Sequence, residues 1–173
     1  MQLVLTNVRP KFLHIFQKHK SKTGEGEPKY SLSLILDKKD DAEQIKKIQD
    51  ILAALKKEHG FNAVGDKCCL RDGADNTEHY DAKWMYLRAS NKNRPQVVDR
   101  AKRPVTEDDN LFYDGCRVNA IVDIYGIKEF KSFSASVEVV QFVRDDEPLG
   151  RPPVDIDKLL PDLSDTVSGD GLD

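Results

Sequence analysis

Aromatic and basic side chains alternate in one stretch of the chain, around residues 83–94. Trp84, Tyr86 and Arg88 share one face of a predicted strand, because successive strand side chains point to opposite sides. Single-stranded nucleic acid exposes a charged backbone and flat bases, so its binding proteins need cations for phosphates and rings for stacking. The pattern therefore indicates a nucleic-acid-binding surface with little sequence preference. The candidate residues are Lys11, Tyr30, Lys83, Trp84, Tyr86, Arg88, Lys92, Arg94, Arg117 and Tyr125.

Two other function classes stay open as alternatives. The first is a metal-dependent nuclease, because acidic residues cluster at Asp72 and Asp75 and again at residues 107–109. Both clusters lie in turn-like segments, where aspartate is common because its side chain bonds to the turn backbone. The second is a protein-interaction or virion-assembly module whose aromatic residues all belong to the core.

The cysteines and glycines argue against other chemistry. Cys68 and Cys69 are adjacent and Cys116 is distant, so the sequence contains no Cys-x-x-Cys pair of the kind that binds structural zinc. No phosphate-binding glycine motif occurs. We therefore expect reduced thiols, no metal, no cofactor and no nucleotide hydrolysis.

The charge of the chain is divided unevenly. Residues 145–173 hold nine acidic and two basic residues, whereas the preceding part is net positive although the whole chain carries −3. An acidic tail on a basic body suggests either an internal mimic of a polyanion or a docking segment for basic partners. The candidate tail residues are Asp162, Asp165, Asp170, Leu172 and Asp173.

The elements that must position these side chains are mostly strands. Strand patterns occur at residues 3–8, 12–16, 30–36, 82–90, 96–99, 116–124 and 134–143. A basic, glycine-containing hairpin loop is expected at residues 17–29. One amphipathic helix interrupts the strands, with a capping-box start at Asp40 and Glu43 and an end at Gly60. This order predicts a mainly β domain, a small closed barrel with one inserted helix.

Length and composition limit the domain organisation. With 173 residues, 39% hydrophobic and 33% charged, the chain has room for one domain and a short appendage. We expect the domain at residues 1–147 and a proline-containing linker with a disordered acidic tail at 148–173. The longest apolar run, residues 51–55, is too short to cross a membrane. No signal peptide is evident, so an intracellular protein is expected.

Several short motifs in order resemble a known family. These are Asp72-Gly73, Trp84, Ala89-Ser90, residues 94–99, residues 113–116 and residues 139–142. Together they resemble bacteriophage single-stranded DNA-binding proteins over most of residues 1–150.

The resemblance implies a five-stranded OB-fold that coats single strands during phage replication or recombination, without catalysis, in the host cytoplasm. It also implies an acidic tail that docks replication proteins such as a polymerase, helicase or primase. Homo-oligomer formation is left open, and no membrane partner is expected.

Overall fold

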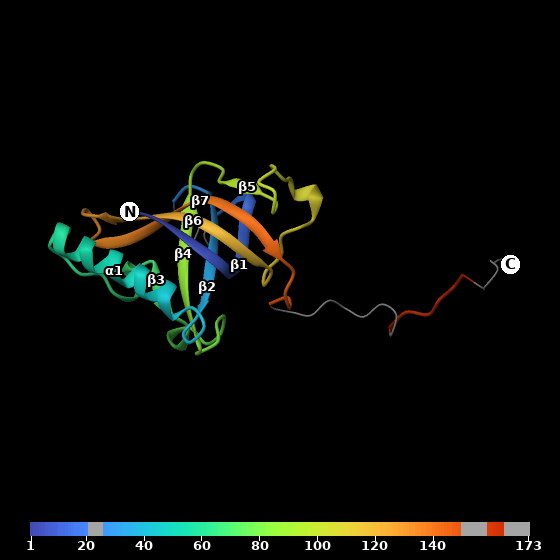
Figure 1. The fold of residues 1–173 in the computed structure, drawn as a ribbon, viewed down its shortest axis with the longest axis horizontal. Coiled ribbons are helices and arrows are strands. Elements are labelled where there is room, and N and C mark those ends of the chain that lie inside the picture. The colour runs from blue at the N-terminus through green and yellow to red at the C-terminus, as the bar shows by residue number, and fades with distance from the viewer. Residues whose placement is uncertain (21–25, 150–158, 165–173) are drawn as a thin grey trace.

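The computed structural model describes residues 1–20, 26–149 and 159–164. The elements follow the order β1 (Gln2–His19), β2 (Lys29–Asp37), α1 (Ala42–His59), β3 (Leu70–Asp72), β4 (Trp84–Asn91), β5 (Gln96–Val98), β6 (Arg117–Ile127) and β7 (Ser132–Arg144). Strands β4, β2, β1, β6 and β7 are neighbours in that order, and pairing of β4 with β7 at Ser90 and Ser136 closes them into a barrel (Figure 1). The predicted five-stranded barrel with one helix is confirmed.

The barrel interior follows the predicted alternation. On β4, Leu87 and Ala89 are buried in the main core, and Met85 packs against it from a partly buried position. On β6, Val118, Ala120, Val122 and Ile124 are buried. The residues between them therefore point to the outer face of the barrel, where Arg88 is exposed but Tyr86 is only 4% exposed.

The first strand differs from the prediction, which placed two strands at residues 3–8 and 12–16. β1 is one strand of 18 residues with two bulges, and its register shifts against β6 between Leu5 and Val8 and against β2 between Lys11 and His14. Asn7 (φ 54°) and Phe12 (φ 55°) adopt left-handed conformations at these two shifts. A bulge adds one unpaired residue without ending the strand, so the alternation is broken although pairing continues.

The predicted helix is confirmed, but its predicted start is wrong. The N-cap is Asp41 rather than Asp40, and its side chain makes no capping bond. The Asp41 carboxylate instead accepts a hydrogen bond from the Asp37 amide at 2.8 Å. Gly60 ends the helix at φ 75°, and Ile45, Ile48 and Leu55 form its buried face.

Other expectations concern the chain's ends and its thiols. Cys68, Cys69 and Cys116 are all free, in line with the expected reduced thiols, and all three are buried. None of the helices in the described part of the chain is long and apolar enough to cross a membrane. Asp162 is exposed, whereas Asp165, Asp170, Leu172 and Asp173 lie outside the described residues.

Candidate nucleic-acid interface

An open groove of about 580 Å³ lies on the outer surface of the barrel. One side is formed by β1, β2 and β4, and the other by residues 66–69 and the start of β7. Strand pairing places Lys11, Ser33 and Arg88 in one row across three strands, and His14, Ser31 and Ser90 in the next. The predicted residues Tyr86 and Arg88 both line this groove.

Phe12 is an aromatic side chain presented to the groove by the second bulge of β1. The side chain is 40% exposed although the residue is large and apolar. The Asp114 carboxylate accepts hydrogen bonds from the amides of Phe12 and Leu13 at 3.1 and 3.2 Å, which holds the left-handed backbone in place. Strained backbone of this kind is concentrated at functional sites. Phe12 is therefore the ring best placed to stack on a base.

Two stacked tyrosines lie beside Phe12, and one of them, Tyr80, contacts its ring. The rings of Tyr80 and Tyr86 stack with centroids 3.7 Å apart, and the Tyr80 hydroxyl donates to Ser33 Oγ at 2.8 Å. Burial raises the pKa of Tyr80, so its hydroxyl stays neutral at physiological pH. Phe12 meets Tyr80 edge to face at a centroid distance of 6.2 Å. Tyr86 is only 4% exposed, so its ring is not open to a base, contrary to the prediction that it stacks on DNA.

Trp84 lies beside this aromatic group rather than in the groove. It is half-buried against the cluster of Ile35, Tyr80 and Tyr86 on the outside of the barrel. Its position outside the main core agrees with the predicted alternation of β4. Leu149 lies against the same cluster, so this aromatic surface is partly covered by the chain itself.

The positive charge of the groove comes from Lys67, Arg71 and Arg88. Arg71 donates to the backbone oxygens of Cys68 and Asp66 at 2.9 and 3.0 Å, which orients its guanidinium without neutralising it. Among the described residues, none of these three cations has a carboxylate within 4.0 Å. They are therefore free to meet an anionic backbone.

Lys11 is the predicted cation closest to Phe12. Its ammonium lies 5.0 Å from the Phe12 ring centroid and 5.2 Å from that of Tyr80, and it donates to the backbone oxygen of His79. Burial lowers the pKa of Lys11, with Asp114 opposing the shift. Lys11 therefore contacts the rings of Phe12 and Tyr80 and also lies in the strand row that contains Arg88.

Two histidines of β1 extend the groove beyond Phe12. The rings of His14 and His19 stack with centroids 4.0 Å apart, and both line the groove. Burial lowers the pKa of His14, and the neighbouring His19 lowers it further while Asp114 acts in the opposite direction. His14 is therefore mainly neutral at pH 7, and it offers a flat surface rather than a charge.

Cys68 and Cys69 also line the groove. A hydrogen bond between the two thiols lowers the pKa of Cys68 to about 6 and raises that of Cys69. Both side chains are buried.

The other predicted residues lie around the groove or away from it. Tyr30 lies near the start of β2 and has the same parity as the interior residue Leu32. Arg94 Cζ lies 5.8 Å and Lys18 Nζ 5.9 Å from the centroid of its ring. Tyr125 is 40% exposed and pairs with Ser134, a residue of the groove. Three other predicted residues do not line the groove: Lys83 and Lys92, both exposed, and Arg117, which is paired with Asp146.

Sequence reasoning missed Phe12, His14, His19, Lys67, Arg71, His79 and Tyr80 as groove residues. Phe12 looked like the start of a strand, and nothing local marks the bulge that turns it outward. Tyr80 and His79 belong to the segment between β3 and β4, which carries no periodic pattern. The one available signal was the density of histidine and aromatic residues at positions 12–19.

Two of the carboxylates considered for a nuclease, Asp72 and Asp109, accept hydrogen bonds from nearby backbone amides. Asp72 pairs with Lys38 at 2.7 Å and accepts a hydrogen bond from the Ala74 amide at 2.9 Å. Asp109 accepts from the Thr106 amide at 2.7 Å and closes a short 3-10 turn. Within the described ranges, no group of three or more His, Cys, Asp or Glu side chains is arranged to hold a metal ion.

The amino-acid sequence of this chain is similar to those of phage proteins. Residues 1–159 match a sequence family described as the ssDNA-binding protein of Enterobacter phage Enc34. Putative protein p50 of Acyrthosiphon pisum secondary endosymbiont phage 1 is 36% identical over 162 residues, 84% of each chain.

Solved structures agree with the family match. The single-stranded DNA-binding protein of bacteriophage Enc34, in complex with ssDNA, is similar with a TM-score of 0.72 and 26% identity over 86% of this chain and 89% of that one. The single-stranded DNA-binding protein gp2.5 of bacteriophage T7 shares the fold, with a TM-score of 0.54 and 13% identity over 98% of both chains.

Proposed function

Because the chain belongs to the family of the phage Enc34 ssDNA-binding protein, we propose that it binds single-stranded DNA along the groove between Phe12, Arg88 and Lys67. The observation that supports this most strongly is the combination of an exposed, backbone-held Phe12 with three unpaired cations in one groove. Rings stack on any base and cations follow the phosphates, so binding has little sequence preference.

We also propose a biological role, which the family and the charge pattern support. The protein coats single strands in the host cytoplasm during phage DNA replication or recombination and has no catalytic step of its own. Its acidic tail docks a polymerase, helicase or primase. The net negative charge after residue 144 supports this docking role, because such proteins present basic surfaces to DNA.

The test is a titration of labelled oligo(dT) followed by fluorescence anisotropy at several salt concentrations. We expect saturable binding whose log K falls with log salt by about 0.7 for each phosphate contact. The labelled strand should stay intact after incubation with magnesium. A salt slope near zero, or cleavage of the strand, would contradict the proposal.

A further inference from the structure

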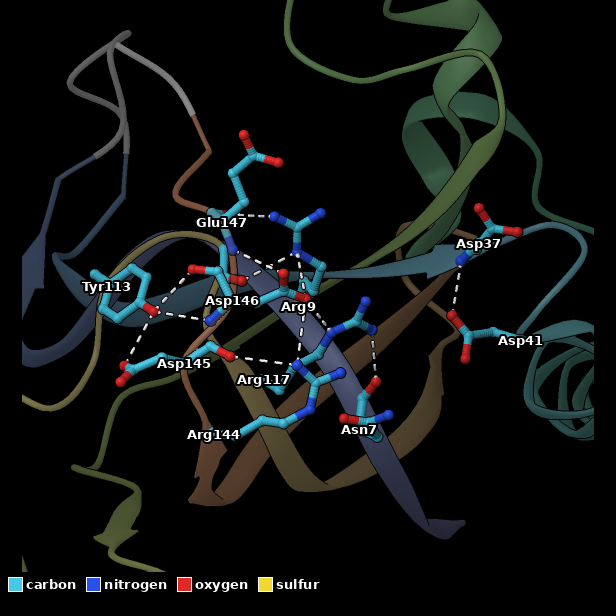
Figure 2. Close-up of polar contacts among 11 residues, drawn as sticks. Asn7, Arg9, Asp37, Asp41, Tyr113, Arg117, Arg144, Asp145, Asp146 and Glu147 are labelled. Carbon is cyan, nitrogen blue, oxygen red and sulfur yellow. Dashed lines mark hydrogen bonds and ion pairs between the residues drawn. The ribbon is translucent and has the colours of Figure 1, made fainter. Parts of the chain in front are cut away.

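The segment that leaves the barrel after β7 crosses back over the outer surface as a strap, residues 145–149. Figure 2 shows Asp146 of this strap surrounded by the side chains of Arg9, Arg117 and Arg144. The Asp146 carboxylate lies 2.7 Å from Arg117 Nε, 3.8 Å from Arg144 Nη1 and 3.9 Å from Arg9 Nε. Arg117 holds the pKa of Asp146 below its ordinary value, so the carboxylate is charged at neutral pH.

The residues that receive the strap are the Tyr113-Asp114-Gly115 motif. The Tyr113 hydroxyl accepts a hydrogen bond from the Asp146 amide at 2.9 Å, and the Asp114 oxygen accepts one from the Leu149 amide at 2.9 Å. Gly115 has φ +103°, and a Cβ there would lie 2.6 Å from the Glu147 oxygen. The absence of a side chain at Gly115 therefore allows the strap to pack directly against the barrel.

The strap covers the part of the sheet that continues the groove. Strand pairing places Arg9, Ile35 and Tyr86 in one row across β1, β2 and β4. This row is two residues, about 7 Å, from the groove row of Lys11, Ser33 and Arg88. Leu149 packs against the cluster of Ile35, Tyr80 and Tyr86, as Trp84 does, while the Glu147 backbone oxygen accepts a hydrogen bond from Arg9.

We infer that the strap covers an extension of the ssDNA path, in which Arg9 and Arg117 bind a backbone phosphate and Trp84 contacts a base. The Asp146 carboxylate occupies the position that this phosphate would take, because arginine binds carboxylate and phosphate oxygens in the same way. The extension explains why a tryptophan and a cluster of arginines lie beside the groove and yet are occupied by the chain itself. It rests on the proposed function, and it concerns a surface outside the groove.

The test compares two single-charge variants of the full chain by oligo(dT) anisotropy over a range of salt. In Asp146→Ala the arginines lose their carboxylate. We expect the log-log salt slope to steepen by about 0.7 for each phosphate gained, which is about fivefold tighter binding per phosphate at about 0.1 M salt. Asp146→Asn, which keeps the side-chain shape, should change binding in the same direction.

Asp145→Ala is the matched control, because it removes the same charge from the same strap. The Asp145 carboxylate contacts the Tyr113 hydroxyl at 3.0 Å and is not paired with the three arginines. Binding by Asp145→Ala should equal that of the unaltered chain, and the double variant D146A/R117A should lose the gain.

Each remaining outcome separates the inference from the proposed function. Equal gains in Asp145→Ala and Asp146→Ala would mean that only overall charge matters, and no gain in either Asp146 variant would mean that no DNA reaches the arginines. Both results overturn the inference while leaving the groove intact. Failure of the unaltered chain to bind oligo(dT) would instead overturn the proposed function.

Discussion

Replacing Phe12 with alanine should weaken oligo(dT) binding by about 5- to 150-fold, which corresponds to the 1–3 kcal/mol that stacking on an aromatic side chain contributes per base. The ring is 40% exposed on a bulge whose amides are held by Asp114. The ring does not belong to the main hydrophobic core, so the free energy of unfolding should change less than the affinity. Fluorescence anisotropy with labelled oligo(dT) measures the loss.

Phe12→Tyr is the control for this prediction, because it keeps a ring at the same backbone position. Its affinity should stay close to that of the unaltered chain. If the alanine and tyrosine variants bind oligo(dT) equally well, Phe12 is not a stacking residue.

The second large effect is expected from the groove cations Lys67 and Arg88. Both are exposed, and neither pairs with a carboxylate of the described residues. The double variant K67Q/R88Q should have a salt slope shallower by about 1.4, because two phosphate contacts are lost. By the same relation, binding at about 0.1 M salt should weaken about 25-fold.

Lys46 and Lys47 provide the matched control for charge. Both are exposed on α1 and neither lines the groove, so K46Q/K47Q changes the net charge of the chain by the same amount. Its salt slope should equal that of the unaltered chain. A similar loss in both double variants would show that binding follows the overall charge and would contradict a groove at Lys67 and Arg88.

The barrel could be predicted from the sequence because its strands alternate regularly. Most of β6 buries every second residue, β4 directs Met85, Leu87 and Ala89 to the main core, and the inserted helix has an apolar face and ends at a left-handed Gly60. The three-residue strand β3 carries no periodic signal, and it was missed. β1 was divided in two, because its bulges at Asn7 and Phe12 change which side the residues face.

The candidate site was harder to predict, because it depends on which segments the closed barrel brings together. Tyr86 and Arg88 were predicted from the alternation of β4 and both line the groove, but Tyr86 is buried there by packing that the alternation does not show. Phe12 was missed because its exposure depends on Asp114, a residue 102 positions away in the chain. Arg117 has the charge that phosphate binding requires, but its guanidinium is paired with the Asp146 carboxylate. A sequence pattern does not show this pairing.

Photo-cross-linking of the full chain to oligonucleotides that carry 5-bromodeoxyuridine tests the position of the DNA most directly. The groove on β1, β2 and β4 predicts cross-links in the β1 segment that holds Phe12, His14 and His19, or at His79 and Tyr80. Cross-links confined to α1, with none in these segments, would contradict the account.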